Sequence, residues 1–223
     1  MGLTIHGPRR LSQLERDAVS LVFGDSESFS DENLHDVVRI QVVNSLVSGN
    51  DEAEGDQANG LIRISKRQHP YTDDIDHSNT RGNTDLWKPG NLYYLDTFIH
   101  EAAHWWQKDQ NRYTDRTPDY DFDYDMVRDL DFPCKEGHAA AVAVAFILSW
   151  QLRYRPTNQN VDLTHSPRFK PEFVGKVNRY EEIRNIATQS GSNNPPAGRH
   201  VTRTKAQQLL DAFNILLDQL NGN

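Results

Sequence analysis

The sequence is poor in cysteine and in long apolar runs. Cys134 is the only cysteine in 223 residues, which excludes a disulfide within the chain. The longest apolar run, 139–148, has ten residues, whereas a helix that spans a bilayer needs about 20, so we expect no membrane insertion. The first 17 residues contain no apolar core of a signal peptide. We therefore expect synthesis in the cytoplasm, with any export through a secretion system that does not use signal peptides.

Positive charge is also scarce. The chain has 24 Lys and Arg against 32 Asp and Glu, which gives a formal net charge of -8 at pH 7. Such an acidic chain repels phosphate backbones and anionic lipids, so we expect neither nucleic acid nor a membrane surface as a partner. The mean hydropathy of -0.75 indicates long polar loops around a modest core. The length suits a single domain, which we expect over residues 1–223.

Hydrophobic periodicity predicts a helix, then two strands, then mostly helices. In the first part we expect a helix at 12–23, strands at 37–43 and 61–65, and an acidic loop at 48–60 between the strands. A helix should then run from about Asp96, as its N-cap, to about Gln110, followed by an acidic aromatic linker at 115–133. An apolar helix at 135–154 and helices near 174–189 and 202–220 complete the chain. This order indicates an α+β fold, with a helix and strands in residues 1–94 and a mostly helical part in residues 95–223.

The stretch 97–107 carries the clearest chemical signal, the pattern His-Glu-x-x-His. On a helix, His100 and His104 share one face, so both imidazoles can bind the same metal ion. Glu101 lies beside them and is placed to accept a proton from an attacking water. A metzincin would need Gly and His where this chain has Gln107 and Gln110, so that class of peptidase is excluded.

A catalytic zinc site needs a third protein ligand, and Glu136 is the best one in the sequence. It opens the apolar helix, and small residues follow it at the spacing of one helix face, which favours close packing against the helix that carries the two histidines. His138 is a rival ligand, but it lies about 200° around the helix from Glu136, so both cannot face one metal ion. Asp129 and Asp131 are weaker rivals.

The acidic aromatic linker partly matches a calcium-binding loop, but the match fails at two required positions. A calcium loop that starts at Asp119 would need Gly and Glu where the chain has Tyr124 and Leu130. The same region offers candidates for the group that stabilises the negative oxygen of the transition state, opposite the metal. These candidates are Tyr124, Tyr120 and His138.

Three stretches carry a family resemblance over residues 9–150. They are the helix end Val-Phe-Gly-Asp at 22–25 with a strand at 38–40, the segment Phe-Ile-His-Glu-Ala-Ala-His-Trp-Trp-Gln at 98–107, and Glu-x-x-Ala at 136–139 after the acidic linker. The chain resembles the zincin-like metallopeptidases found as Vgr-related proteins and as core domains of contractile injection systems and polymorphic toxins. It departs from their Glu-x-Gln-Ala pattern by carrying His138. The resemblance implies a zincin fold, a gluzincin-like His-His-Glu zinc site and a link to bacterial effector secretion.

These observations favour a zinc metallopeptidase in which His100, His104 and Glu136 bind Zn²⁺ and Glu101 is the general base. The substrate would be a peptide or protein, for which the strand at 61–65 is a candidate edge strand. A secretion apparatus or an immunity protein is a further expected partner. Two alternatives stay open: a zincin module without catalytic activity that serves as an effector or scaffold, and a zinc amidase or deacylase with the same ligands.

Overall fold

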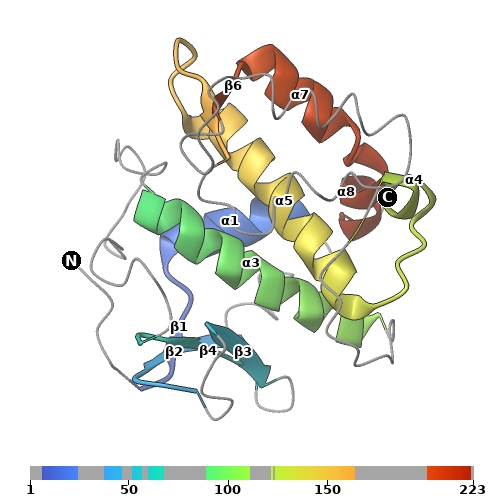
Figure 1. The fold of residues 1–223 in the computed structure, drawn as a ribbon. Coiled ribbons are helices and arrows are strands. Elements are labelled where there is room, and N and C mark those ends of the chain that lie inside the picture. Colours follow the sequence, from blue (N-terminus) through green and yellow to red (C-terminus); the bar gives the residue numbers. More distant parts are fainter. Residues whose placement is uncertain are drawn as a thin grey trace.

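The computed structural model describes residues 7–24, 38–46, 52–56, 60–67, 89–110, 122, 124–163 and 200–221. Its elements are β1 (Arg9–Arg10), α1 (Gln13–Phe23), β2 (Arg39–Val43), β3 (Ala53–Asp56), β4 (Leu61–Ser65), α3 (Pro89–Asp109), α4 (Tyr124–Asp129), α5 (Lys135–Tyr154), β5 (Val161–Asp162), β6 (His200–Val201), α7 (Arg203–Asp211) and α8 (Asn214–Leu220). The expected α+β class is confirmed, with more helix than strand and a small mixed sheet (Figure 1). No helix in these ranges is long and apolar enough to cross a membrane.

The larger sheet has four strands in the order β1-β2-β4-β3, and it corrects two expectations. β2 and β4 are parallel, whereas β1 and β3 run antiparallel to their neighbours. β4 is therefore an inner strand and not an edge strand, consistent with the burial of Leu61, Ile62, Ile64 and Ser65. Among the described residues the edges of this sheet are β1 and β3, and β3 lies inside the segment 48–60 that was expected to be a loop. Its sequence Ala-Glu-Gly-Asp has low strand propensity, so pairing with β4 outweighs local preference.

A buried polar network fastens α1 to its surroundings. Ser12 caps the helix, and Glu15 returns a side-chain hydrogen bond to the Ser12 backbone N–H, which forms a capping box. Glu15 is 0% exposed and accepts hydrogen bonds from Arg9 Nη1 at 2.8 Å and Nη2 at 2.7 Å. The Tyr94 hydroxyl also donates to Glu15. One carboxylate thus connects β1, α1 and α3.

The two long helices α3 and α5 pack against each other and form the centre of the molecule. α3 also contacts β3 and β4, so it lies between the sheet and α5 (Figure 1). It begins at Pro89, a residue that the first turn of a helix tolerates, and Asp96 lies buried inside it instead of capping it. α5 has the predicted bounds, 135–154, and is buried from Gly137 to Leu148 and at Trp150 and Gln151. Both helices contain small buried residues, which are Ala102 and Ala103 on α3 and Ala139, Ala140 and Ala143 on α5.

The C-terminal segment covers α5 from the other side (Figure 1). The single helix expected at 202–220 is two helices, α7 and α8, because the chain turns between them and buries Phe213. Thr202 caps α7 through a hydrogen bond from the Lys205 backbone N–H of 3.3 Å. The linker expected at 115–133 contains the short helix α4. The helix expected at 174–189 lies outside the described residues.

Candidate metal centre

α3 places the two histidines of the motif one turn apart, as its spacing predicts. His100 and His104 are 2% and 6% exposed, and their ring centroids lie 4.8 Å apart in an edge-to-face arrangement. The opposite face of α3 is apolar, with Phe98, Ile99 and Ala102 in the core. Burial of that face fixes the rotation of the helix, and this rotation aims both imidazoles toward α5.

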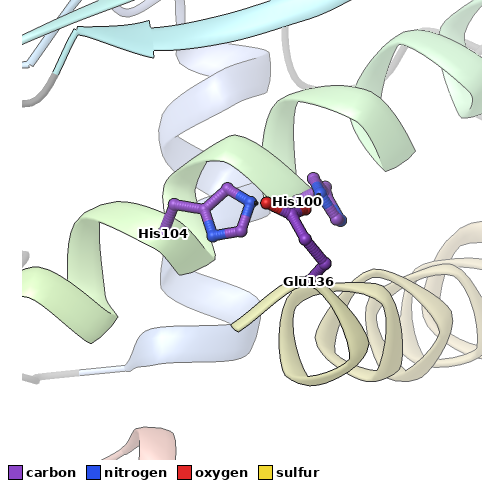
Figure 2. Close-up of side chains that lie close together, drawn as sticks. All are labelled: His100, His104 and Glu136. Carbon is purple, nitrogen blue, oxygen red and sulfur yellow. Dashed lines mark hydrogen bonds and ion pairs between the residues drawn. The ribbon is translucent and has the colours of Figure 1, made fainter. Parts of the chain in front are cut away.

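The third donor comes from the first turn of α5. Glu136 Oε2 lies 3.1 Å from His100 Nε2 and 3.0 Å from His104 Nε2, so the carboxylate sits between the two rings (Figure 2). One donor atom from each of the three residues lies within 4.8 Å of the others. Within the described residues, these three form the group of histidine and acidic side chains that could hold a metal ion.

The donor set fits a divalent ion such as zinc. Two imidazole nitrogens and one carboxylate oxygen are the ligands of one class of catalytic zinc sites, which leave a fourth position open. With metal–ligand bonds of about 2.0–2.2 Å, tetrahedral ligand atoms lie about 3.3 Å apart. The two separations between Glu136 and the histidines, 3.0 and 3.1 Å, need a change of only a few tenths of an ångström, whereas the three donor atoms together spread over up to 4.8 Å, so the two imidazoles would move closer to each other around an ion.

The electrostatics of the three side chains are those of a tightly coupled cluster. Burial raises the pKa of Glu136, but hydrogen bonds from His100 and His104 outweigh it and hold the pKa well below its usual range. Burial lowers the pKa of His104, but its hydrogen bond to Glu136 and the nearby charge of Glu101 raise it above its ordinary value. A divalent cation would take over the balancing positive charge that the imidazoles provide here.

Glu101 lies beside the cluster and against the edge strand. It is 9% exposed, and its Oε2 lies 3.3 Å from the point where a Cβ on Gly55 would be. Glu101 thus lies near the two histidines, as the motif predicts. Its contact with β3 was not expected from the sequence. No sequence pattern pointed to Gly55, because its strand was expected to be a loop.

Gln107 joins the cluster to α5, a contact that was not expected from the sequence. Its Oε1 lies 2.8 Å from His104 Nδ1, and its Nε2 lies 2.8 Å from the Lys135 carbonyl oxygen. The same Nε2 lies 2.9 Å from His138 Nδ1. The signal that could have identified Gln107 is its position three residues after His104, which puts both side chains on one face of α3.

The remaining expected site residues lie elsewhere. His138 is 0% exposed and lies behind Gln107, with its ring stacked on Trp106 at 5.7 Å between centroids. It is not one of the three grouped donors, nor are Asp129 and Asp131, which are exposed. Tyr124 begins α4, but its side chain lies outside the described residues, as does Tyr120.

Comparisons with known proteins add no relative to this picture. No protein-family model matches the chain, and no curated protein and no solved structure gives a significant match. The functional argument therefore depends on the residues of the site and on their geometry.

Proposed function

We propose that the chain is a zinc-dependent metallopeptidase of the gluzincin type. His100, His104 and Glu136 would hold the ion. The observation that carries the proposal is the meeting of the Glu136 carboxylate, 32 residues after the motif, with both of its histidines at 3.0 and 3.1 Å. A helical His-Glu-x-x-His pattern alone is also compatible with a purely structural role of the two histidines. A buried carboxylate aimed between the two imidazoles favours metal binding instead, because such a group is costly to bury unless it is paired or ligates a metal.

Glu101 supplies the acid–base chemistry in this proposal. Zinc, when bound, polarises the scissile carbonyl and acidifies water. The Glu101 carboxylate accepts a proton from the attacking water and passes it to the nitrogen of the departing amine. Its position next to His100 in the sequence and against β3 in space keeps it near both the ion and the substrate.

The edge strand β3 is the proposed docking place for the substrate. In the described part of the chain it pairs on one side with β4 and forms the edge of the sheet on the other. An extended peptide can add to such an edge through backbone hydrogen bonds, which favours a peptide over a small molecule. Gly55, with no side chain, lets the peptide and Glu101 approach each other closely. This assignment replaces the strand at 61–65 considered above.

The biological setting is proposed from the resemblance alone. A zincin-like chain similar to core domains of injection systems and polymorphic toxins would act as a bacterial effector or toxin. Its partners would then be a peptide or protein substrate, the secretion apparatus and an immunity protein. The acidic net charge of -8 supports the absence of nucleic acid from this set.

Metal analysis and substrate profiling of one protein preparation test the proposal. We expect near-stoichiometric zinc in protein purified without chelator, and cleavage of peptides from a proteome-derived library by wild type but not by Glu101→Gln. Zinc with cleavage of amide or acyl bonds only in cell-wall fragments or small molecules would indicate an amidase or deacylase. Zinc without any hydrolysis would favour a scaffold module. A chain that binds no zinc would refute the assigned metal site.

A further inference from the structure

The orientation of the Gln107 amide follows from its neighbours. The Lys135 backbone carbonyl can only accept a hydrogen bond, so the group 2.8 Å from it must be the Nε2 donor of Gln107. The amide oxygen therefore faces His104 Nδ1 at 2.8 Å, and that ring nitrogen must donate a proton to it. A histidine whose Nδ1–H is held in this way presents Nε2 as its metal-binding atom. Nε2 is the atom that faces Glu136.

The second N–H of the Gln107 amide reaches His138. With Nε2 of Gln107 as the donor, His138 Nδ1 accepts the hydrogen bond at 2.9 Å. The His138 ring is held in place by its stacking on Trp106 and by an edge-to-face contact with Phe132 at 4.9 Å between centroids. Lys135 and His138 lie on either side of Glu136 in the first turn of α5. The one amide thus joins His104 to the turn that carries the third donor.

We propose that Gln107 is a positioning residue of the metal centre. It fixes the ring of His104 with Nε2 toward the ion, and it sets the first turn of α5 at the distance that brings Glu136 between the histidines. The inference rests on the proposed metal site and adds the reason why the three donors are already assembled. Hydrogen-bonded partners behind metal ligands commonly tune affinity in this way, and their removal costs about 10–100-fold in binding.

Gln151 provides a matched control within the same core. It is also a fully buried glutamine, on α5, and its amide donates to the Asp162 carbonyl oxygen and accepts from the Asp162 backbone N–H at 2.8 Å. Its partners lie toward the other end of α5 and include none of the three donors. Loss of its amide therefore reports the cost of an unsatisfied buried glutamine site without any effect on the metal centre.

Zinc affinity of the chain of residues 1–223 is the first readout, measured by competition with a chromophoric chelator. We expect Gln107→Met, which keeps the chain length and removes the amide, to lower zinc affinity about 10–100-fold. Gln151→Met should lower Tm while leaving zinc affinity within about twofold of wild type, because it removes no partner of a ligand. An equal loss in both variants would mean that general destabilisation explains the effect and would overturn the proposal.

The second readout is the Nδ1 proton of His104, observed by NMR of protein labelled with ¹⁵N-histidine and assigned with the variant His104→Gln. We expect an exchange-protected Nδ1–H signal in wild type, which disappears in Gln107→Met. Gln107→Glu should keep this signal, because a carboxylate still accepts from Nδ1–H. It should nevertheless bind zinc at least about tenfold more weakly, since it cannot donate to Lys135 and His138.

The two readouts separate the failure of this inference from the failure of the proposed function. If wild type binds no zinc, the proposed function fails, and the NMR signal in the metal-free protein decides the role of Gln107. Retention of both the signal and wild-type zinc affinity in Gln107→Met would refute the positioning role. If Gln107→Met does not fold, Gln107→Glu supplies the same decision: zinc affinity equal to wild type would refute the link to α5.

Discussion

Oε2 of Glu101 lies 3.3 Å from the point that a Cβ on Gly55 would occupy, so the edge strand and the proposed general base leave no spare room for a side chain. We expect Gly55→Ala to displace the carboxylate by a few tenths of an ångström. Because misplacement by 1 Å can cost about 100-fold in rate, this smaller shift should lower kcat/KM about 3–10-fold. Zinc content and Tm should stay unchanged.

The matched control is Gly7→Ala, where an added Cβ meets no atom within 4 Å. We expect this variant to have wild-type kcat/KM. Equal activity of Gly55→Ala and Gly7→Ala would show that Glu101 does not depend on this contact.

The side chain of Glu101 should be needed for hydrolysis but not for metal binding. It is not one of the three grouped donors, so Glu101→Gln should retain zinc. Loss of its proton transfer should lower kcat by about 10²–10⁴-fold. Steady-state kinetics and elemental analysis of the same preparation measure both quantities. Wild-type turnover in this variant would remove Glu101 from the mechanism.

Glu136 and His138 should differ sharply in their effect on the metal. We expect Glu136→Ala to reduce zinc affinity more than the about 10–100-fold typical of a partner behind a ligand, because it removes a charged donor oxygen. His138→Phe keeps the ring packing on Trp106 and deletes only the acceptor for Gln107. Its zinc affinity should therefore fall by no more than that range. If His138→Phe releases the metal and Glu136→Ala does not, the ligand set would be three histidines.

The buried ion pair of Arg9 and Glu15 should contribute strongly to stability. Removal of one partner of a buried pair costs about 3–5 kcal/mol, and we expect the lower end for Arg9→Met, because the Arg9 side chain is 28% exposed. Tyr94→Phe removes one hydrogen bond to the same carboxylate and should cost about 1.5–3 kcal/mol. Urea denaturation measures both. A loss below about 0.5 kcal/mol for Arg9→Met would contradict the role given to the pair.

The same carboxylate predicts a pH dependence of stability. Burial raises the pKa of Glu15, but the hydrogen bonds and charge of Arg9 outweigh it and lower the pKa below 4.5. At pH values near the pKa of this carboxyl group, the folded state then binds fewer protons than the unfolded state, so the free energy of unfolding rises with pH. The contribution of Glu15 is complete above pH 4.5 and is lost as pH falls below it. Between about pH 3 and pH 6, the free energy of unfolding, measured by urea denaturation, should rise more steeply with pH in wild type than in Glu15→Gln.

The features that sequence predicted well depend on residues close together in the chain. The helical period placed His100 and His104 on one face, and the uninterrupted apolar stretch gave the bounds of α5. Glu136 could be predicted because it opens a helix whose small residues invite close packing. In each case the pattern lies within one helix, although the meeting of Glu136 with the two histidines depends on how the two helices pack.

The features that sequence did not predict depend on distant pairing. Ala53–Asp56 becomes a strand only because β4 offers it a partner, and β4 becomes an inner strand only because β3 and β2 flank it. The burial of Glu15 is visible only when Arg9 and Tyr94 are brought to it. Gln107 was visible as a residue one turn from His104, but its role depends on Lys135 and His138, which lie on another helix.

Helix α5 contacts α1 and α3, which precede it in the chain, and α7 and α8, which follow it, and its residues from Gly137 to Leu148 are buried. A segment enclosed in this way has no partial opening that exposes its backbone. Its amide protons should therefore exchange with solvent only when the whole domain unfolds, at the slowest rate in the molecule. Since Glu136 directly precedes the buried part of this helix, we expect the third donor to be attached to a segment that keeps its structure until the domain unfolds.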